Sequence, residues 1–114
     1  MNKKKTFGDY FNKGTFTVYE IDYKNEKVKT AKIELKLTKD GKGREYGTFI
    51  HRGGGGHFMF LSKKDMEKMK KDSRTSGEFL YEEDAQKELK KFIGECIEFY
   101  EKKLVEWKEK IKTL

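Results

Sequence analysis

The sequence predicts an α+β fold, a four-stranded antiparallel β-meander followed by a short helix and a long C-terminal amphipathic helix. Two observations predict it. Apolar and polar residues alternate with the period of a strand up to residue 62, and the apolar spacing then changes to threes and fours. We expect one domain with a basic N-terminal arm (1–13), the meander (14–62), the short helix (63–76) and the long helix (82–113), with both helices on one face.

The four strands are predicted from β-branched and aromatic residues between turn signals. The expected strands are 15–23, 28–38, 44–52 and 57–62, and "KDGKG" at 39–43 carries an Asp-Gly hairpin signal. The second strand has the clearest alternation. Its apolar side is Ala31, Ile33, Leu35 and Leu37, and its charged side is Lys32, Glu34 and Lys36.

Helix signals follow the fourth strand. Ser62 with Asp65 three positions later predicts an N-cap, and Gly77 is a suitable C-terminal end for the first helix. The long helix begins at "EEDA", with three carboxylates where the helix dipole favours them. Its apolar stripe is Leu89, Ile93, Cys96, Tyr100, Leu104, Trp107, Ile111 and Leu114, widened by Phe92 and Phe99.

This helix should be roughly 45–50 Å long. A four-stranded sheet of ordinary strands cannot cover a stripe of that length. The end that contains Leu104, Trp107 and Ile111 should therefore contact another copy of the chain or another protein, and we expect a homodimer.

Charge is unevenly distributed along the chain. Residues 1–76 hold 19 Lys and Arg against 10 Asp and Glu, a surplus of nine, whereas residues 77–114 hold 8 against 10. A basic N-terminal part favours a polyanionic partner such as nucleic acid. A lone Cys96 fits a reducing, cytoplasmic setting, and the chain shows no apolar run for a membrane span and no signal peptide.

The stretch "HRGGGGHFMFLS" holds four consecutive glycines, Gly53, Gly54, Gly55 and Gly56, between His51 and His57. It is not a Walker loop or a dinucleotide fingerprint, because no Gly-Lys-Ser/Thr follows and the next element is a strand. A flexible hairpin loop and a loop that contacts phosphate or a partner backbone both remain open. Two histidines without a third ligand do not make a zinc site, and we expect no metal, cofactor, small-molecule substrate or catalytic residues.

The aromatic residues of the strands cannot all lie on one buried face. Rings left on a lysine-rich outer face would form a platform on which unpaired bases stack. The expected nucleic-acid-binding residues are Lys32, Lys36, Lys42, Arg44, Arg52, Tyr46 and Phe49. Since nearly all cations are lysines, which neutralise phosphate as point charges, we expect little sequence preference.

The order of four strands followed by a helix, with "HFMFLSKKDMEKMKK" at the junction, resembles the Pur-alpha-like and transcriptional-positive-cofactor-like single-stranded nucleic-acid-binding proteins. The matching residues are Phe58, Phe60, Leu61 and Ser62, then Met66 and Met69, within residues 14–72. The resemblance implies a dimer that binds a single strand of DNA or RNA across curved sheets. The alternative interpretation is a small accessory or inhibitor protein of a mobile element, such as a phage anti-defence protein, that binds another protein, for example a nucleic-acid-binding protein.

Overall fold

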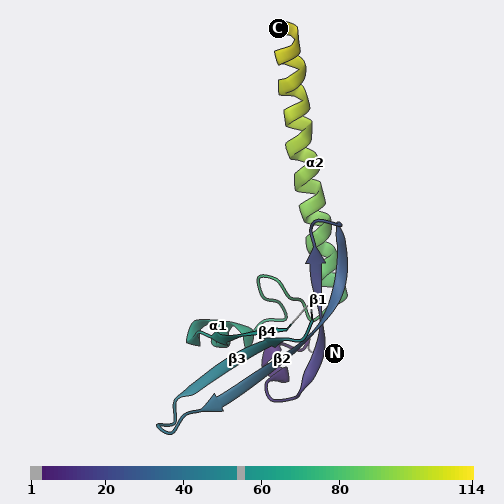
Figure 1. Cartoon of the computed structure of the whole chain (residues 1–114). Coiled ribbons are helices and arrows are strands. Elements are labelled where there is room, and N and C mark those ends of the chain that lie inside the picture. The colour runs from purple at the N-terminus through teal and green to yellow at the C-terminus, as the bar shows by residue number, and fades with distance from the viewer. Residues whose placement is uncertain (1–3, 54–55) are drawn as a thin grey trace.

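The computed structural model describes residues 4–53 and 56–114. Its elements are η1 (Phe7–Tyr10), β1 (Thr15–Asp22), β2 (Lys27–Lys39), β3 (Glu45–His51), β4 (His57–Leu61), α1 (Lys63–Met69) and α2 (Glu82–Thr113) (Figure 1). The strands form one antiparallel sheet in the order β1-β2-β3-β4. The predicted α+β fold is confirmed, and each strand lies within one residue of its expected bounds.

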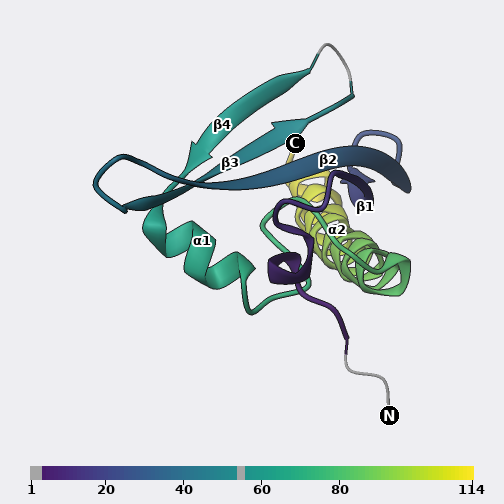
Figure 2. The ribbon, with the colours of Figure 1, turned by 90° about the horizontal axis from the view of Figure 1, so that it is seen from below.

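The sheet has two faces of different character. One face, here called the core face, carries Val18, Ile33, Leu35 and Phe49, which are buried. The opposite, outer face carries Lys32 and Lys36 in β2, as the predicted alternation requires. Figure 2 shows η1, α1 and α2 all on one side of the sheet, so the outer face of β3 and β4 stays uncovered.

The N-terminal segment, predicted to be a basic arm, is part of the core instead. Phe7 is fully buried and Phe11 nearly so, and both belong to the cluster on the core face. The Phe7 N–H donates to the carbonyl of Asp72 (2.9 Å), and the Asn12 N–H donates to the carbonyl of Leu35 (2.8 Å). The prediction of an arm was based on the lysines of this segment. It overlooked two phenylalanines whose spacing allows both to pack on one apolar surface.

Helix α1 begins as predicted and ends earlier than predicted. The Ser62 hydroxyl accepts from the Asp65 N–H (3.1 Å), which confirms the N-cap. The helix ends at Met69 instead of continuing to residue 76, because the following backbone bonds elsewhere: Asp72 accepts from Phe7, and the Leu80 N–H donates to Ser73 (3.0 Å). Gly77 is not a helix cap and lies in a tight turn closed by Thr75 and Glu78.

Helix α2 has the predicted bounds and extends far beyond the sheet (Figure 1). Its first turns bury Ala85 and Leu89, and Phe92 meets Tyr23 of the β1–β2 turn edge-on with ring centroids 4.7 Å apart. From Ile97 onward the apolar side chains of the stripe are exposed, and the molecule measures 71 × 35 × 26 Å. Among the described residues, no helix has the length and apolarity needed to cross a membrane.

We predict that Gly8→Ala destabilises the fold by about 1–3 kcal/mol. A methyl group at Gly8 would lie 2.8 Å from the carbonyl oxygen of Lys70 and 2.9 Å from its Cα, and backbone cannot move aside as a flexible side chain would. Urea unfolding measures the change. Gly77→Ala is the matched control, since open space surrounds Gly77. Equal stability of the two variants would contradict the close packing of η1 on the end of α1.

Candidate nucleic-acid interface

Three exposed aromatic rings gather on the outer face. Tyr46 in β3 and Phe58 and Phe60 in β4 are 40%, 64% and 70% exposed. Phe60 meets Tyr46 and Phe58 edge-on, with ring centroids 6.4 Å and 5.9 Å apart. Rings this exposed lose the benefit of burial, so the cluster offers a ready surface for a flat apolar partner. We call Tyr46, Phe58 and Phe60 the aromatic cluster.

The cations of β2 share this face with the aromatic cluster. In the strand register, Lys36 is opposite Thr48, and Thr48 is opposite Phe60. Two strand spacings therefore separate the backbones of Lys36 and Phe60, about 10 Å. Lys32 lies further along β2, where its ammonium donates to the Thr17 hydroxyl. The predicted residues Lys32, Lys36 and Tyr46 thus lie on one surface.

Glu34 is the only acidic residue at an outer-face position of the four strands. Its carboxylate accepts from the Arg52 guanidinium at 2.6 Å and lies 3.9 Å from the Lys36 ammonium. The hydrogen bond from Arg52 lowers the pKa of the Glu34 carboxyl, and the charge of Lys36 adds to this effect. Glu34 therefore neutralises part of the positive charge that an approaching phosphate would meet.

Lys42 and Arg44 occupy the β2–β3 turn, at the opposite end of β3 from Arg52. The Asp40 carboxylate shapes this turn by accepting from the Lys42 and Arg44 N–H groups, and it also binds the Arg44 side chain (3.0 Å). These hydrogen bonds, chiefly that of the Arg44 N–H, lower the pKa of Asp40. Gly43, with a φ of +79°, supplies the left-handed residue of the turn. The cations thus border the aromatic cluster at both ends.

Phe49 is a correction to the predicted site. It is 3% exposed and packs in the core cluster on the opposite face from Tyr46. Phe58 and Phe60, rather than Phe49, are the exposed phenylalanines of the outer face, although the strand pattern alone did not identify them as site residues. Their spacing of two residues shows that they share a face, but only the pairing of Phe49 with Met59 and of Ile50 with Phe58 shows which face it is.

The histidines beside the glycine run form a stacked pair on the core-face side. The rings of His51 and His57 are 5.1 Å apart and nearly parallel. His51 Nε2 lies 3.1 Å from a Glu20 carboxylate oxygen, and the Gly53 N–H donates to its Nδ1 (3.2 Å). Across residues 4–53 and 56–114, no three His, Cys, Asp or Glu side chains are placed to share a metal ion.

The Gly56 N–H donates to the Gly53 carbonyl (3.1 Å), so the two described ends of the glycine run lie close together. Gly54 and Gly55, which belong to the predicted flexible loop, lie outside the described residues. This hydrogen bond fits the hairpin interpretation of the run. It leaves the predicted contact with a phosphate or a partner backbone as a hypothesis.

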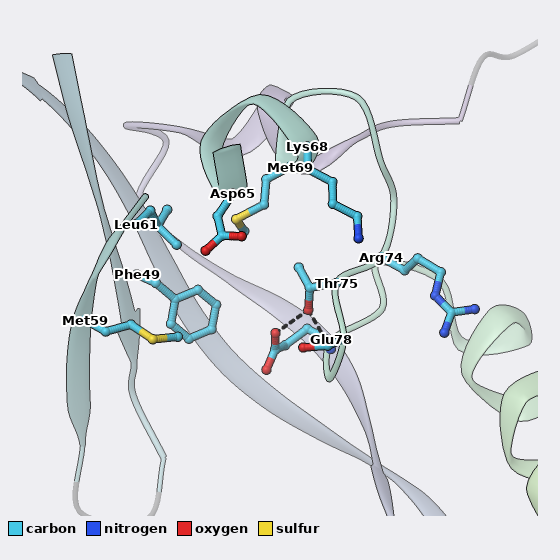
Figure 3. A pocket seen from close by; sticks show the side chains of 10 residues that line it. Phe49, Met59, Leu61, Asp65, Lys68, Met69, Arg74, Thr75 and Glu78 are labelled. Atoms are coloured by element: carbon cyan, nitrogen blue, oxygen red, sulfur yellow. Dashed lines mark hydrogen bonds between the residues drawn. The ribbon is translucent and has the colours of Figure 1, made fainter. Parts of the chain in front are cut away.

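A groove of about 220 Å³ lies on the core-face side, between β4, α1 and the turn at 74–78 (Figure 3). Its apolar wall is formed by Phe49, Met59 and Leu61 from the sheet and Met69 from α1. Charged side chains, among them Asp65, Lys68 and Arg74, form its rim. Between the wall and the turn the Thr75 hydroxyl donates to the Glu78 carboxylate, and the apolar wall suits an apolar side chain of a partner.

Comparison of the chain with protein-family models, with curated proteins and with solved structures finds no match. The arrangement of the residues is therefore the basis for the functional proposal.

We predict that the Glu34 carboxyl titrates below its ordinary pKa and that Arg52→Ala raises this pKa, because the variant removes its main hydrogen bond. A folded-state pKa that is lowered stabilises the fold above the unfolded-state pKa, and this contribution is lost as pH falls through the lowered value. Carbon-detected NMR titration of the side-chain carboxyls measures it. Asp22, whose pKa is lowered by Asn25, is the internal control and should not respond. An unchanged Glu34 curve would contradict the ion pair.

Proposed function

We propose that this chain binds single-stranded DNA or RNA on its outer face, as a binding protein and not as an enzyme. One observation carries the proposal: the aromatic cluster is exposed on the same sheet face as Lys32 and Lys36. Stacking of an unpaired base on an aromatic side chain contributes about 1–3 kcal/mol, and neighbouring cations attract the phosphates. The resemblance of residues 14–72 to single-stranded nucleic-acid-binding proteins supports the same class of ligand.

The bound strand would lie along β3 and β4, with bases toward Phe58 and Phe60 and phosphates toward β2. The interval from Arg44 to Arg52 along β3 spans on the order of 25 Å, which is room for several nucleotides. Duplex ends and grooves suit this face poorly, because a stacking platform needs bases that are free of partners.

Little sequence preference is expected from the cations present. Arg44 and Arg52 already hold Asp40 and Glu34. Their guanidinium groups are therefore committed to carboxylates and are not free for bidentate contacts with base edges. Lysines contact phosphates without reading sequence. We assign the activity to the cytoplasm, since the single Cys96 suits a reducing compartment.

We predict that Phe60→Ala weakens binding of a labelled single-stranded oligonucleotide by about 1–3 kcal/mol, because it removes the most exposed ring of the cluster. Fluorescence anisotropy at fixed salt measures the affinity. Phe99→Ala is the matched control, as Phe99 is a similarly exposed phenylalanine on α2, away from the sheet. Equal losses in the two variants would refute the aromatic cluster as the binding surface.

Charge variants on the outer face should change the salt dependence in opposite directions. Lys36→Ala removes one phosphate contact and should flatten the log–log salt slope by about 0.7. Glu34→Gln releases Arg52 and Lys36 from their carboxylate, so it should tighten binding and steepen the slope. Measurements on several unrelated sequences should give parallel shifts. A slope that both variants leave unchanged would exclude this face as the phosphate-binding surface.

A second candidate function is docking on another protein, as in an accessory or inhibitor protein of a mobile element. The groove beside Met59 favours it, because an apolar wall with a charged rim suits a partner side chain. Absence of oligonucleotide binding at low salt would favour this function over the first.

A further inference from the structure

The free part of α2 carries a seven-residue repeat that the sheet does not use. Apolar residues recur at alternating intervals of four and three from Ile93 to Leu114. In heptad terms the a positions are Ile97, Leu104 and Ile111, and the d positions are Ile93, Tyr100, Trp107 and Leu114. This period of 3.5 residues is that of a helix that winds round a second helix, rather than of one that lies on a sheet.

The repeat is exposed where a partner helix would cover it. Every a and d residue from Ile97 to Leu114 is half or more exposed. Nearer the sheet, Phe92 is covered by Tyr23, and Ile93 is half-buried. The uncovered seam therefore begins at Ile97, directly beyond the β1–β2 turn, and runs to Leu114 over roughly 25 Å.

We propose that the partner is a second copy of this chain and that the two helices pair in antiparallel orientation through residues 97–114. In an antiparallel pair, a residues face d residues of the partner helix. Aligning Leu104 with the other copy's Trp107 also places Ile111 against Tyr100 and Ile97 against Leu114. Each aromatic side chain then meets an aliphatic one, which packs large against small residues. A parallel pair would instead stack Tyr100 on Tyr100 and Trp107 on Trp107 in the d layers.

The flanking charges favour the same orientation. In the antiparallel alignment, Glu101 of one copy lies beside Lys108 of the other. The two-fold symmetry of the dimer repeats this attractive contact, so it occurs twice. In a parallel pair, Lys103 of one copy lies beside Lys108 of the other, and the two like charges repel. No pair of opposite charges compensates for this repulsion. The antiparallel pair brings Lys103 near Lys110, and Lys103 is paired with Glu106 of its own helix (3.3 Å) in either orientation. The lysine repulsions are therefore similar in the two orientations, and the two attractions between Glu101 and Lys108 favour the antiparallel one.

The alignment also fits the shape of the molecule. The partner's Leu114 would end opposite Ile97, so the second helix stops before the contact between Phe92 and Tyr23. If the partner helix were shifted by one heptad toward the sheet, its C-terminal end would extend past Phe92. The same shift would place Glu101 of one copy beside Glu101 of the other. The two sheets would then lie at opposite ends of the helix pair, each with its outer face free. This dimer is independent of the proposed function.

Sedimentation equilibrium of the full chain at micromolar concentrations tests the dimer. Trp107→Glu should raise the dissociation constant by about 30-fold or more, as for a large central anchor. The domain should stay folded by circular dichroism, because Trp107 is half exposed and lies outside the core. Val105→Glu is the control, since Val105 is exposed but off the seam, and it should change the constant by roughly twofold at most. A monomer at every concentration, or equal effects of the two variants, would overturn the proposal.

The orientation has its own test. Lys108→Glu places carboxylates of residues 101 and 108 side by side in the antiparallel dimer and should weaken it by about tenfold. In a parallel dimer the same change would face Lys103 and strengthen association. Glu101→Lys combined with Lys108→Glu restores opposite charges and should return the constant to the parent value. Strengthening by the single variant, or no recovery in the double variant, would overturn the antiparallel alignment.

Discussion

The burial of Phe7 is the contact on which the rest of the structure depends. Its ring fills the cluster over the core face of the sheet, and its N–H holds the chain that leaves α1. The residues just before it reach the start of α2, through an ion pair between Lys4 and Asp84 and a hydrogen bond from the Lys5 N–H to Tyr81. One short segment thus connects the sheet and both helices. The packing of this segment on the end of α1 also explains why the backbone of Lys70 fills the space beside Gly8.

Covering one face of the sheet leaves the other available. Because η1, α1 and α2 gather on one side, the outer face keeps the aromatic cluster in solvent together with the lysines of β2 (Figure 2). Exposed phenylalanines on an edge strand favour aggregation unless a ligand or partner covers them. Glu34 moderates the charge of the same surface by holding Arg52. The proposed binding of nucleic acid would satisfy both the rings and the cations.

Helix α2 is longer than the sheet on which it packs. This difference in length leaves a second apolar surface without a partner. Two buried positions, Ala85 and Leu89, fix the start of this helix, and the contact between Phe92 and Tyr23 ends its support. Beyond that point the helix has no neighbour in the part of the chain that the structure describes, although its apolar repeat continues (Figure 1). A helix pair at this end would hold two outer faces in one molecule, which would increase avidity for the proposed nucleic-acid ligand.

The sequence by itself determined the four strands, the start of α1 and the bounds of α2, because their signals are local: alternation in the strands, the cap at Ser62 and the long periodicity of α2. It also determined that Lys32 and Lys36 share a face, since parity along one strand requires no knowledge of the others. Tertiary structure decided the rest. Only pairing between strands placed Phe49 inside and Phe58 outside, and only long-range bonds ended α1 early and drew Phe7 into the core. These outcomes depend on contacts between residues distant in the chain, which no local pattern encodes.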